Sequence, residues 1–302
     1  MKILLIYNLS SGRGKFVQSL SKIKQFFKTN DYIYDIYDTR LKDNLIDDVT
    51  KLAPNYDVLV IAGGDGTIHA VINGMMAVDI NKRPRLLVLP FGTTNDFANM
   101  LGLGKDIDFN LALLKTKHYR LSDVYRLNDE YFVYAAAAGK FTNISYNIDR
   151  SHLRKMGSFG YIFNARKDLL KKYDLKIDVK TSKLHIKRKA FLIFIAAGSR
   201  VGGFNISKFS KSPKFNDGKI DVRIFTRNHI FSWMKLIWFY IFKGRHFHND
   251  IHIHTDDITI RLDGDAIWNV DGEAGPKGDI NIRVLSKQIE VYVHPKMIHK
   301  LY

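Results

Sequence analysis

The first third of the chain alternates between short apolar runs and segments with helical spacing. Apolar residues run continuously over 3–7, 58–62 and 86–89, as in strands that are covered on both faces. Between the first two runs, apolar residues recur every three or four positions, as on one face of a helix: Phe16, Leu20, Ile23 and Phe27, then Leu41, Leu45, Ile46 and Val49. Strands that alternate with helices predict right-handed crossovers and a largely parallel sheet.

The pattern changes near residue 120. Beyond it, short and often alternating segments are separated by turn-forming residues, which predicts an antiparallel sandwich or barrel. Two segments with helical character interrupt these strands, around 157–172 and 229–243. We therefore predict two domains: an α/β domain over residues 1–122 and a β-rich domain over 123–302, the last residues of which could pack back on the first domain.

A glycine-rich turn follows the buried strand that ends at residue 62. The sequence GGDGT, residues 63–67, stands before a helix with one apolar stripe, formed by Ile68, Val71, Ile72 and Met75. Backbone N–H groups at a helix N-terminus, unobstructed by Cβ atoms, form an anion site suited to phosphate. We expect Thr67 to cap the helix and Asp65 to lie at the carboxyl end of the sheet, where ligands bind in such folds. A simple tight turn is the alternative.

Polar loops also follow the first and third strands. They contain Asn8, Ser10, Ser11, Gly12 and Lys15 in one case, and Gly92, Thr93, Thr94, Asn95 and Asp96 in the other. Each loop alone would also suit an N-cap and a turn, but three such loops at successive strand ends predict a nucleotide site. Neither a Walker A nor a dinucleotide GxGxxG pattern fits, because Phe16 follows Gly14-Lys15 and Val17 stands where the last glycine would be.

These motifs resemble the catalytic domain of the diacylglycerol kinase family, which includes bacterial soluble lipid kinases and the sphingosine and ceramide kinases. The segments GGDGTIHAVINGMM and PFGTTNDFA carry the resemblance, and NLSSGRG, DTRLKDN, FNDGKIDV and VDGEAG extend it over nearly the whole chain. It implies an ATP- and Mg²⁺-dependent kinase that phosphorylates the hydroxyl of a diacylglycerol-like lipid, giving a phosphatidic-acid-like product. Two positions depart from the family pattern: Leu9 replaces a proline and Ala70 replaces a glutamate.

The resemblance also implies an active site in a cleft between the two domains. ATP would be bound by the residues of the three loops and by the threonine of DTRLKDN: Asn8, Ser10, Ser11, Gly12, Lys15, Thr39, Gly63, Gly64, Asp65, Gly66, Thr67, Gly92, Thr93, Thr94, Asn95 and Asp96. Asp65, Asp271 and Glu273 would supply the base and the Mg²⁺ ligands. Either Asp65 or Glu273 could be the base, and an acidic β-turn is the alternative interpretation of the late DGE sequence.

A second Mg²⁺ is implied by the FNDGKIDV segment. The side chain of Asp217 and the backbone carbonyls of Lys214 and Lys219 would hold it, since hard cations accept such oxygen ligands. A plain turn before a strand is the alternative. The histidines at 246, 248, 252 and 254 have a spacing of two that zinc or nickel could exploit, but no matching carboxylate or cysteine set is evident. We expect them to line a solvated strand face.

The net charge of the chain indicates a negatively charged partner. Lys and Arg number 47 against 30 Asp and Glu, a net charge of +17, which implies attraction to nucleic acid, nucleotide phosphates or an anionic membrane. Aromatic and cationic residues mix over 229–247, as in a membrane-facing helix, although a core helix is the commoner use of such a segment. No apolar run approaches the roughly 18 residues of a membrane span, and cysteine is absent. We expect a cytoplasmic protein at the inner face of the membrane, with a homodimer possible.

Three other functions remain open. NAD kinases share the GGDGT motif but fit the PFGTTNDFA segment less well. A nucleic-acid-binding protein would suit the charge, yet no RRM, KH or zinc-finger signature is present, so no nucleic acid is expected. A lipid-binding relative with little catalysis is the third, because Ala70 replaces the usual glutamate.

Overall fold

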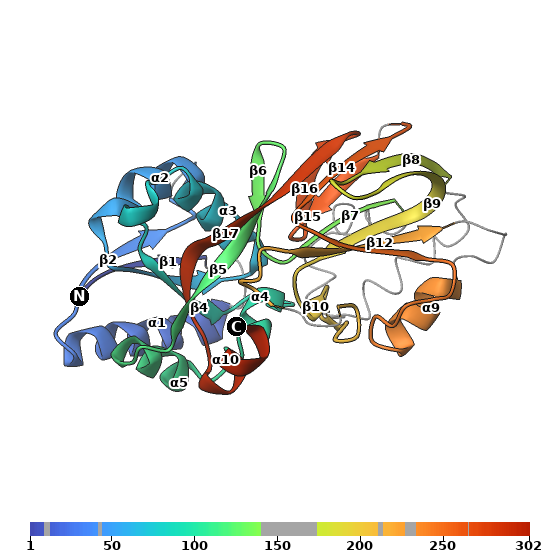
Figure 1. Ribbon diagram of the computed structural model, residues 1–302. Helices are drawn as coiled ribbons and strands as arrows, with labels where there is room; N and C mark the ends of the chain where they lie inside the picture. Colours follow the sequence, from blue (N-terminus) through green and yellow to red (C-terminus); the bar gives the residue numbers. More distant parts are fainter. Residues whose placement is uncertain (9–12, 42–43, 140–173, 211–213, 227–233, 265) are drawn as a thin grey trace. The chain divides into compact units, whose positions relative to one another are not determined.

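The computed structural model describes residues 1–8, 13–41, 44–139, 174–210, 214–226, 234–264 and 266–302 (Figure 1). The chain folds into two compact units. The first comprises Met1–Val124 and Ser286–Tyr302, and the second comprises Tyr125–Leu285. Strands β5 (Tyr119–Leu127) and β17 (Ile280–Tyr292) contribute residues to both units.

The first unit is a parallel α/β fold. Its other elements are β1 (Lys2–Tyr7), α1 (Arg13–Thr29), β2 (Ile33–Asp38), α2 (Leu45–Leu52), β3 (Val58–Gly63), α3 (Asp65–Met76), β4 (Arg85–Pro90), α4 (Asp96–Met100), α5 (Ile107–Ala112), α10 (Pro295–Leu301) and the 3₁₀ turns Ala53–Asn55, Ile80–Lys82 and Leu113–Lys115. The strands pair in parallel in the order β2-β1-β3-β4, and β17 joins β4 in parallel through Val291 and Leu86.

Helices cover both faces of this sheet, with α2 and α3 on one side and α1, α5 and α10 on the other (Figure 1). All six residues of β3 are buried, as are the inner residues of β1 and β4, which explains why these strands have continuous apolar runs. One expectation was wrong: Leu41 does not belong to the second helix and is 77% exposed. The helix begins at Leu45 because the side chain of Asn44 caps it, accepting a hydrogen bond from the Asp47 N–H at 3.2 Å.

The carboxyl ends of the parallel strands meet at one edge of the sheet. The chain leaves β1 toward β2 on one side, whereas β3 pairs with the other side of β1, so the connections diverge between β1 and β3. Hydrogen bonds hold the exits together at this edge: the N–H of Asn8 donates to the Ala62 carbonyl at 3.1 Å and that of Phe91 to the Gly63 carbonyl at 3.0 Å. The loops after β1, β3 and β4 therefore start beside one another.

The C-terminal segment completes the first unit. The guanidinium of Arg83 donates to the carbonyl of Gln288 at 3.1 Å and to its side-chain oxygen at 2.9 Å. The hydroxyl of Tyr302 hydrogen-bonds to that of Ser122, and Leu301 is buried. The last residues are thus fixed by buried and hydrogen-bonded contacts.

The second unit is rich in antiparallel strands. Its elements are β6 (Glu130–Phe132), β7 (Ala135–Gly139), β8 (Leu175–Lys180), β9 (His185–Ala196), β10 (Arg200–Val201), β11 (Phe204–Asn205), β12 (Ile220–Thr226), α9 (Met234–Ile241), β13 (Ile251–Thr255), β14 (Asp257–Leu262), β15 (Ile267–Val270) and β16 (Glu273–Lys277). The polar first half of β9 pairs with β8, and its apolar second half pairs with β7 and β12. The predicted fold class, an α/β part followed by a β-rich part, is confirmed.

The two helical interludes have different outcomes. The segment 157–172 lies outside the described residues, while the second interlude contains α9, whose Leu236 and Phe239 belong to a core cluster with Phe191, Phe194, Phe209 and Phe225. No helix in the part of the chain that the structure describes is long and apolar enough to cross a membrane.

Candidate active site

The loops after β3 and β4 are in direct backbone contact. A Cβ atom built on Gly92 would lie 2.5 Å from the Cα of Gly64, closer than real Cβ contacts come, and one built on Gly64 would lie 3.1 Å from the Cα of Gly92. Both positions therefore require glycine for packing, since neither residue has a positive φ. This contact brings the GGDGT turn against the PFGTTND loop.

The helix start in GGDGT differs from the expectation for Thr67. Helix α3 begins at Asp65, and Gly64 occupies the cap position without a side-chain cap. Thr67 is buried in the first turn, where a Cβ on Gly63 would come within 2.8 Å of its side chain. Thr67 therefore packs against Gly63 instead of capping the helix through its side chain, and its N–H donates to the Gly64 carbonyl at 3.0 Å.

The loop after β4 is shaped by Asn95. Its backbone is left-handed, with φ of 49°, a conformation that asparagine tolerates better than most residues. Its side-chain oxygen accepts from the Gly92 N–H at 2.7 Å, and its side-chain amide donates to the Gly92 carbonyl at 2.8 Å. Asn95 thus stabilises the loop conformation through these two hydrogen bonds. The exposed Thr93 and the half-buried Thr94 belong to the same loop.

Asp65 joins the two loops through its carboxylate. It accepts a hydrogen bond from the Thr94 hydroxyl at 2.9 Å, from the Asp96 N–H at 3.2 Å and from the Phe97 N–H at 3.3 Å. The last two donors belong to the first turn of α4, and Asp65 itself opens α3. An anion is favoured at both helix starts, so the carboxylate is held where two helices favour negative charge.

This arrangement fits a phosphate group with a hard cation. Helix α3 starts at Asp65, its N-terminus favours an anion, and Asp65 is half-buried at the same point. Carboxylate oxygen is a ligand type that Mg²⁺ prefers. Asp96 is different: its side chain is fully buried, and its backbone N–H donates a hydrogen bond to the Asp65 carboxylate.

Two other predicted residues lie at the same edge of the sheet. Asn8 follows β1, and Thr39 follows β2 with its N–H donating to the Tyr7 carbonyl at 3.1 Å. Ser10, Ser11 and Gly12 lie outside the described residues. Lys15 lies in α1, and its side chain is likewise outside them. Their predicted contacts with ATP stay predictions.

A buried carboxylate beside Thr39 was missed by sequence reasoning. Asp38 accepts the Tyr7 hydroxyl at 3.0 Å and binds Arg40 through its guanidinium at 2.6 Å. The Arg40 hydrogen bond is the main reason that the pKa of Asp38 falls to about 2. Local sequence gives little signal for it, because IYDIYD reads as an ordinary edge strand with exposed polar positions.

In the second unit, Asp271 has a structural position. It is 1% exposed, and its two oxygens accept from the N–H groups of Val133 at 2.8 Å, Tyr134 at 3.1 Å and Ala135 at 3.0 Å. Asp271 and Gly272, both at positive φ, form the two-residue turn between β15 and β16. The carboxylate thus connects this hairpin to the start of β7. Asp271 therefore has the role that the sequence analysis gave as the alternative, a residue of an acidic β-turn.

Glu273 lies beside it as the first residue of β16, half-buried and paired with Val270. It belongs to the second unit and Asp65 to the first. The prediction that the two carboxylates serve one active site therefore stays a prediction.

The proposed metal loop shows a turn. The Oδ1 atom of the exposed Asp217 accepts the N–H of Lys219 at 3.0 Å, and the Lys219 ammonium binds Asp256 at 3.0 Å. Lys214 precedes this turn in the half-buried stretch before β12. Among the residues that the structure describes, no cluster of three or more His, Asp or Glu side chains is suited to a metal. The predicted Mg²⁺ site uses carbonyl oxygens and one carboxylate, so it stays a prediction.

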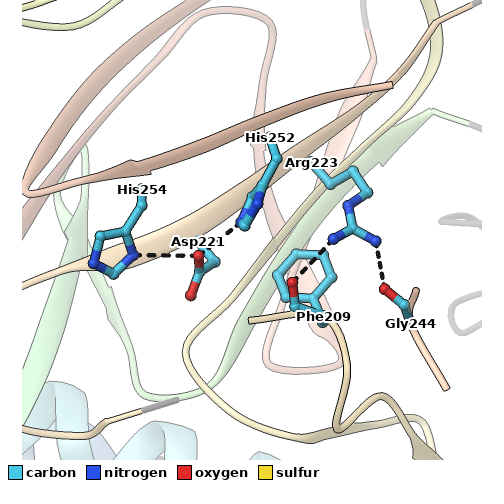
Figure 2. Close-up of polar contacts among 6 residues, drawn as sticks. All are labelled: Phe209, Asp221, Arg223, Gly244, His252 and His254. Carbon is cyan, nitrogen blue, oxygen red and sulfur yellow. Dashed lines mark hydrogen bonds and ion pairs between the residues drawn. The ribbon is translucent and has the colours of Figure 1, made fainter. Parts of the chain in front are cut away.

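The histidines have a carboxylate partner that sequence reasoning did not find. His252 and His254 on β13 both face Asp221 on β12, at 2.8 and 3.2 Å from its Oδ1 atom (Figure 2). Asp221 is 5% exposed, and these partners, with Ser210, hold its pKa below the usual value against the effect of burial. His246 and His248 precede β13 and are not on that strand. The single solvated face expected for all four is therefore wrong.

Asp38 predicts a pH dependence of stability. Its pKa is lowered from 3.8 to about 2 in the folded protein, so its contribution is complete above about pH 4 and is lost as the pH falls toward 2. We expect Asp38→Asn to lower the free energy of unfolding by about 1 kcal/mol at pH 7, a value discounted because solvent screens the exposed Arg40. Denaturant unfolding at pH 7 and pH 2 would measure this, with Asp129→Asn at a 98% exposed carboxylate as control. A difference that persists undiminished at pH 2 would contradict it.

Asp271 predicts a loss of stability on a conservative change. Asp271→Asn keeps the shape and suits the φ of 50°, but its amide would face the Val133 N–H. We expect a loss of about 1–3 kcal/mol for the buried N–H left unpaired. Glu273→Gln, two residues away and half-buried, is the matched control, with an expected change below about 0.5 kcal/mol. Equal melting temperatures for Asp271→Asn and wild type would refute the structural role.

Comparisons with known proteins agree with this architecture. Residues 2–127 match the sequence model of the family described as "Diacylglycerol kinase catalytic domain". Two curated proteins named "Diacylglycerol kinase", from Staphylococcus aureus strains bovine RF122 / ET3-1 and MRSA252, are each 28% identical over 301 residues, 98% of this chain and 93% of theirs. A crystal structure described as a diacylglycerol kinase from Bacillus anthracis str. Sterne aligns with a TM-score of 0.81 at 23% identity and 98% coverage of both chains, which shows a shared fold.

The family match covers β1 to β5, and so it includes the loops that Asp65 joins. The resemblance seen in the GGDGT and PFGTTND motifs is confirmed. Over residues 2–127 the chain is therefore similar to the catalytic domain of the diacylglycerol kinase family.

Proposed function

We propose that this protein is a lipid kinase that transfers the γ-phosphoryl group of ATP to the hydroxyl of a diacylglycerol-like lipid. The observation that carries the proposal is the joining of the GGDGT and PFGTTND loops by Asp65, within a domain that matches the family. The relatives named diacylglycerol kinase, which align over 98% of the chain, support the acceptor class. The product would be a phosphatidic-acid-like lipid.

The first unit is proposed to bind the nucleotide. Mg²⁺ supplies charge neutralisation on the phosphate oxygens when bound. The N–H groups at the start of α3 would hold phosphate, because a helix N-terminus favours an anion. Asp65 would hold the cation directly or through water, because it is an anchored carboxylate at this edge. Asn8 and Thr39 would contact the nucleotide from the neighbouring strands.

Glu273 is proposed as the group that takes the proton from the lipid hydroxyl. Of the two acidic residues in the DGE turn, Asp271 is committed to three backbone N–H groups and is almost fully buried. Glu273 is the half-buried one. A positioned carboxylate base contributes about 10²–10⁴-fold to such a transfer. Asp271 would therefore shape the turn that carries Glu273 and take no part in the proton transfer.

The working environment is proposed to be the cytoplasmic surface of an anionic membrane. The net charge of +17 favours such a surface, and the lipid acceptor would be embedded there. Because the lipid acceptor is insoluble in water, the protein would have to bind the membrane surface in order to reach it.

Transfer of ³²P from γ-labelled ATP tests the function. The purified protein is mixed with MgCl₂ and, in separate reactions, with diacylglycerol in phosphatidylglycerol vesicles or with NAD, and the products are separated by chromatography. We expect label in a phosphatidic-acid-like lipid and none in NAD. Label in NAD alone, or in neither acceptor, would overturn the proposal.

The roles of Asp65 and Glu273 predict a kinetic pattern. Asp65→Asn and Glu273→Gln should each lower kcat by about 10²–10⁴-fold, because each removes a charge from a group acting in the transition state. ATP affinity should change little in Glu273→Gln and fall in Asp65→Asn, which holds the metal. Glu130→Gln in β6 serves as a control that removes one carboxylate elsewhere in the second unit.

The double variant distinguishes one active site from two independent effects. If both residues act on the same step, the double variant should lose much less than the product of the two single losses. Turnover is measured with ATP titrations, and thermal melts confirm folding. Wild-type turnover in both single variants would refute the assigned roles, and losses that simply multiply would refute a shared step.

A further inference from the structure

Helix α9 presents large apolar side chains on both of its faces. Leu236 and Phe239 are buried in the core of the second unit. On the opposite side, Met234, Ile237, Trp238 and Ile241 are 55%, 47%, 36% and 66% exposed. These four follow the spacing i, i+3, i+4, i+7 and therefore form one continuous stripe along the helix. We call these four residues the outer face of α9.

A buried lysine fixes which side of α9 points outward. Lys235 is 4% exposed, and its ammonium donates to the fully buried carboxylate of Asp250 at 2.8 Å and to the Thr226 carbonyl at 2.9 Å. Leaving either charge of such a pair alone in the interior would be costly. Rotation of the helix that buried the outer face would pull Lys235 away from Asp250. The apolar stripe is therefore held outward by the polar contacts of the opposite face.

A buried arginine fixes the end of the same helix. Arg223 on β12 is 1% exposed, and its guanidinium donates to the Gly244 carbonyl and to the Phe209 carbonyl, the latter at 2.9 Å (Figure 2). Gly244 follows α9 at φ of 86°, and its N–H closes the helix by donating to the Phe239 carbonyl at 2.7 Å. Arg223 thus anchors the helix terminus to the sheet.

Cations border the outer face. Lys243 and Arg245 follow α9 directly and are exposed, and the N–H of the exposed Lys208 donates to the Lys243 carbonyl at 2.8 Å, which brings a third cation to this end. The sequence has no Asp or Glu from 222 to 249 or from 198 to 216. An exposed Trp and aliphatic side chains beside exposed cations suit the boundary between lipid headgroups and acyl chains.

We propose that the outer face of α9 docks on an anionic lipid membrane, with Met234, Ile237, Trp238 and Ile241 entering the acyl boundary and Lys208, Lys243 and Arg245 contacting headgroup phosphates. That this membrane also supplies the lipid acceptor rests on the proposed function. A second copy of the chain fits this surface poorly, because a two-fold contact between apolar stripes would give Lys208, Lys243 and Arg245 no anion to contact. Nucleic acid offers nothing that would bury the aliphatic stripe.

Vesicle binding of matched variants tests the proposal. Ile237→Glu places a charge in the outer face, and Ile80→Glu places the same charge at an equally exposed isoleucine, 49% against 47%, in the first unit. With vesicles of phosphatidylglycerol and phosphatidylcholine, sedimentation should show at least about a tenfold loss of affinity for Ile237→Glu and little change for Ile80→Glu. Dibrominated acyl chains should quench wild-type tryptophan fluorescence, and Trp238→Phe should remove most of that quenching.

Four results would overturn the docking surface. The first three are wild-type vesicle binding by Ile237→Glu, an equal loss in Ile80→Glu, and unchanged quenching in Trp238→Phe. A loss of dimer in sedimentation velocity with vesicle binding intact would show that the face joins two copies, which also overturns it. Phosphorylation of a water-soluble short-chain diacylglycerol separates this inference from the proposed function: Ile237→Glu should retain it, while failure of the wild type on that acceptor would refute the kinase and leave the vesicle result standing.

Discussion

The backbone contact between Gly64 and Gly92 is the constraint on which the candidate active site depends. A single additional carbon at Gly92 would lie 2.5 Å from the opposing Cα, so the two loops can approach only without side chains at these positions. Their approach places the Thr94 hydroxyl and the first N–H groups of α4 within reach of Asp65. Packing at one contact thereby positions a carboxylate and two helix starts together.

In the second unit, buried polar groups position the residues that have proposed roles. Asp271 shapes the turn that carries Glu273, and Lys235 and Arg223 set the orientation and the end of α9. Each of these charges is almost fully buried, and each makes at least two hydrogen bonds to groups of the protein. Surface residues with proposed roles, Glu273 and the outer face of α9, are thus positioned by buried residues that take no part in those roles.

Local sequence was sufficient for the elements and loops whose signals are local. The continuous apolar runs identified β1, β3 and β4, and the glycines marked the turn at β3. Relations that depend on register or on distant packing were out of reach. Asp221 meets His252 and His254 because β12 pairs with β13 in one register, and Asp271 meets Val133 across more than a hundred residues. The cap expected at Thr67 was wrong because helix α3 begins at Asp65, and its cap position is occupied by Gly64, which has no side chain to signal it.

The central claim is that one edge of the first unit binds ATP through the loops that Asp65 joins. Hydrogen exchange in the presence and absence of ATP and Mg²⁺ tests it most directly, because it reports on backbone N–H groups. The account predicts that ATP slows exchange together in segments 8–15, 63–69 and 90–96, and that Asp65→Asn weakens this protection. Protection confined to the second unit, or unchanged exchange at 63–69, would contradict it.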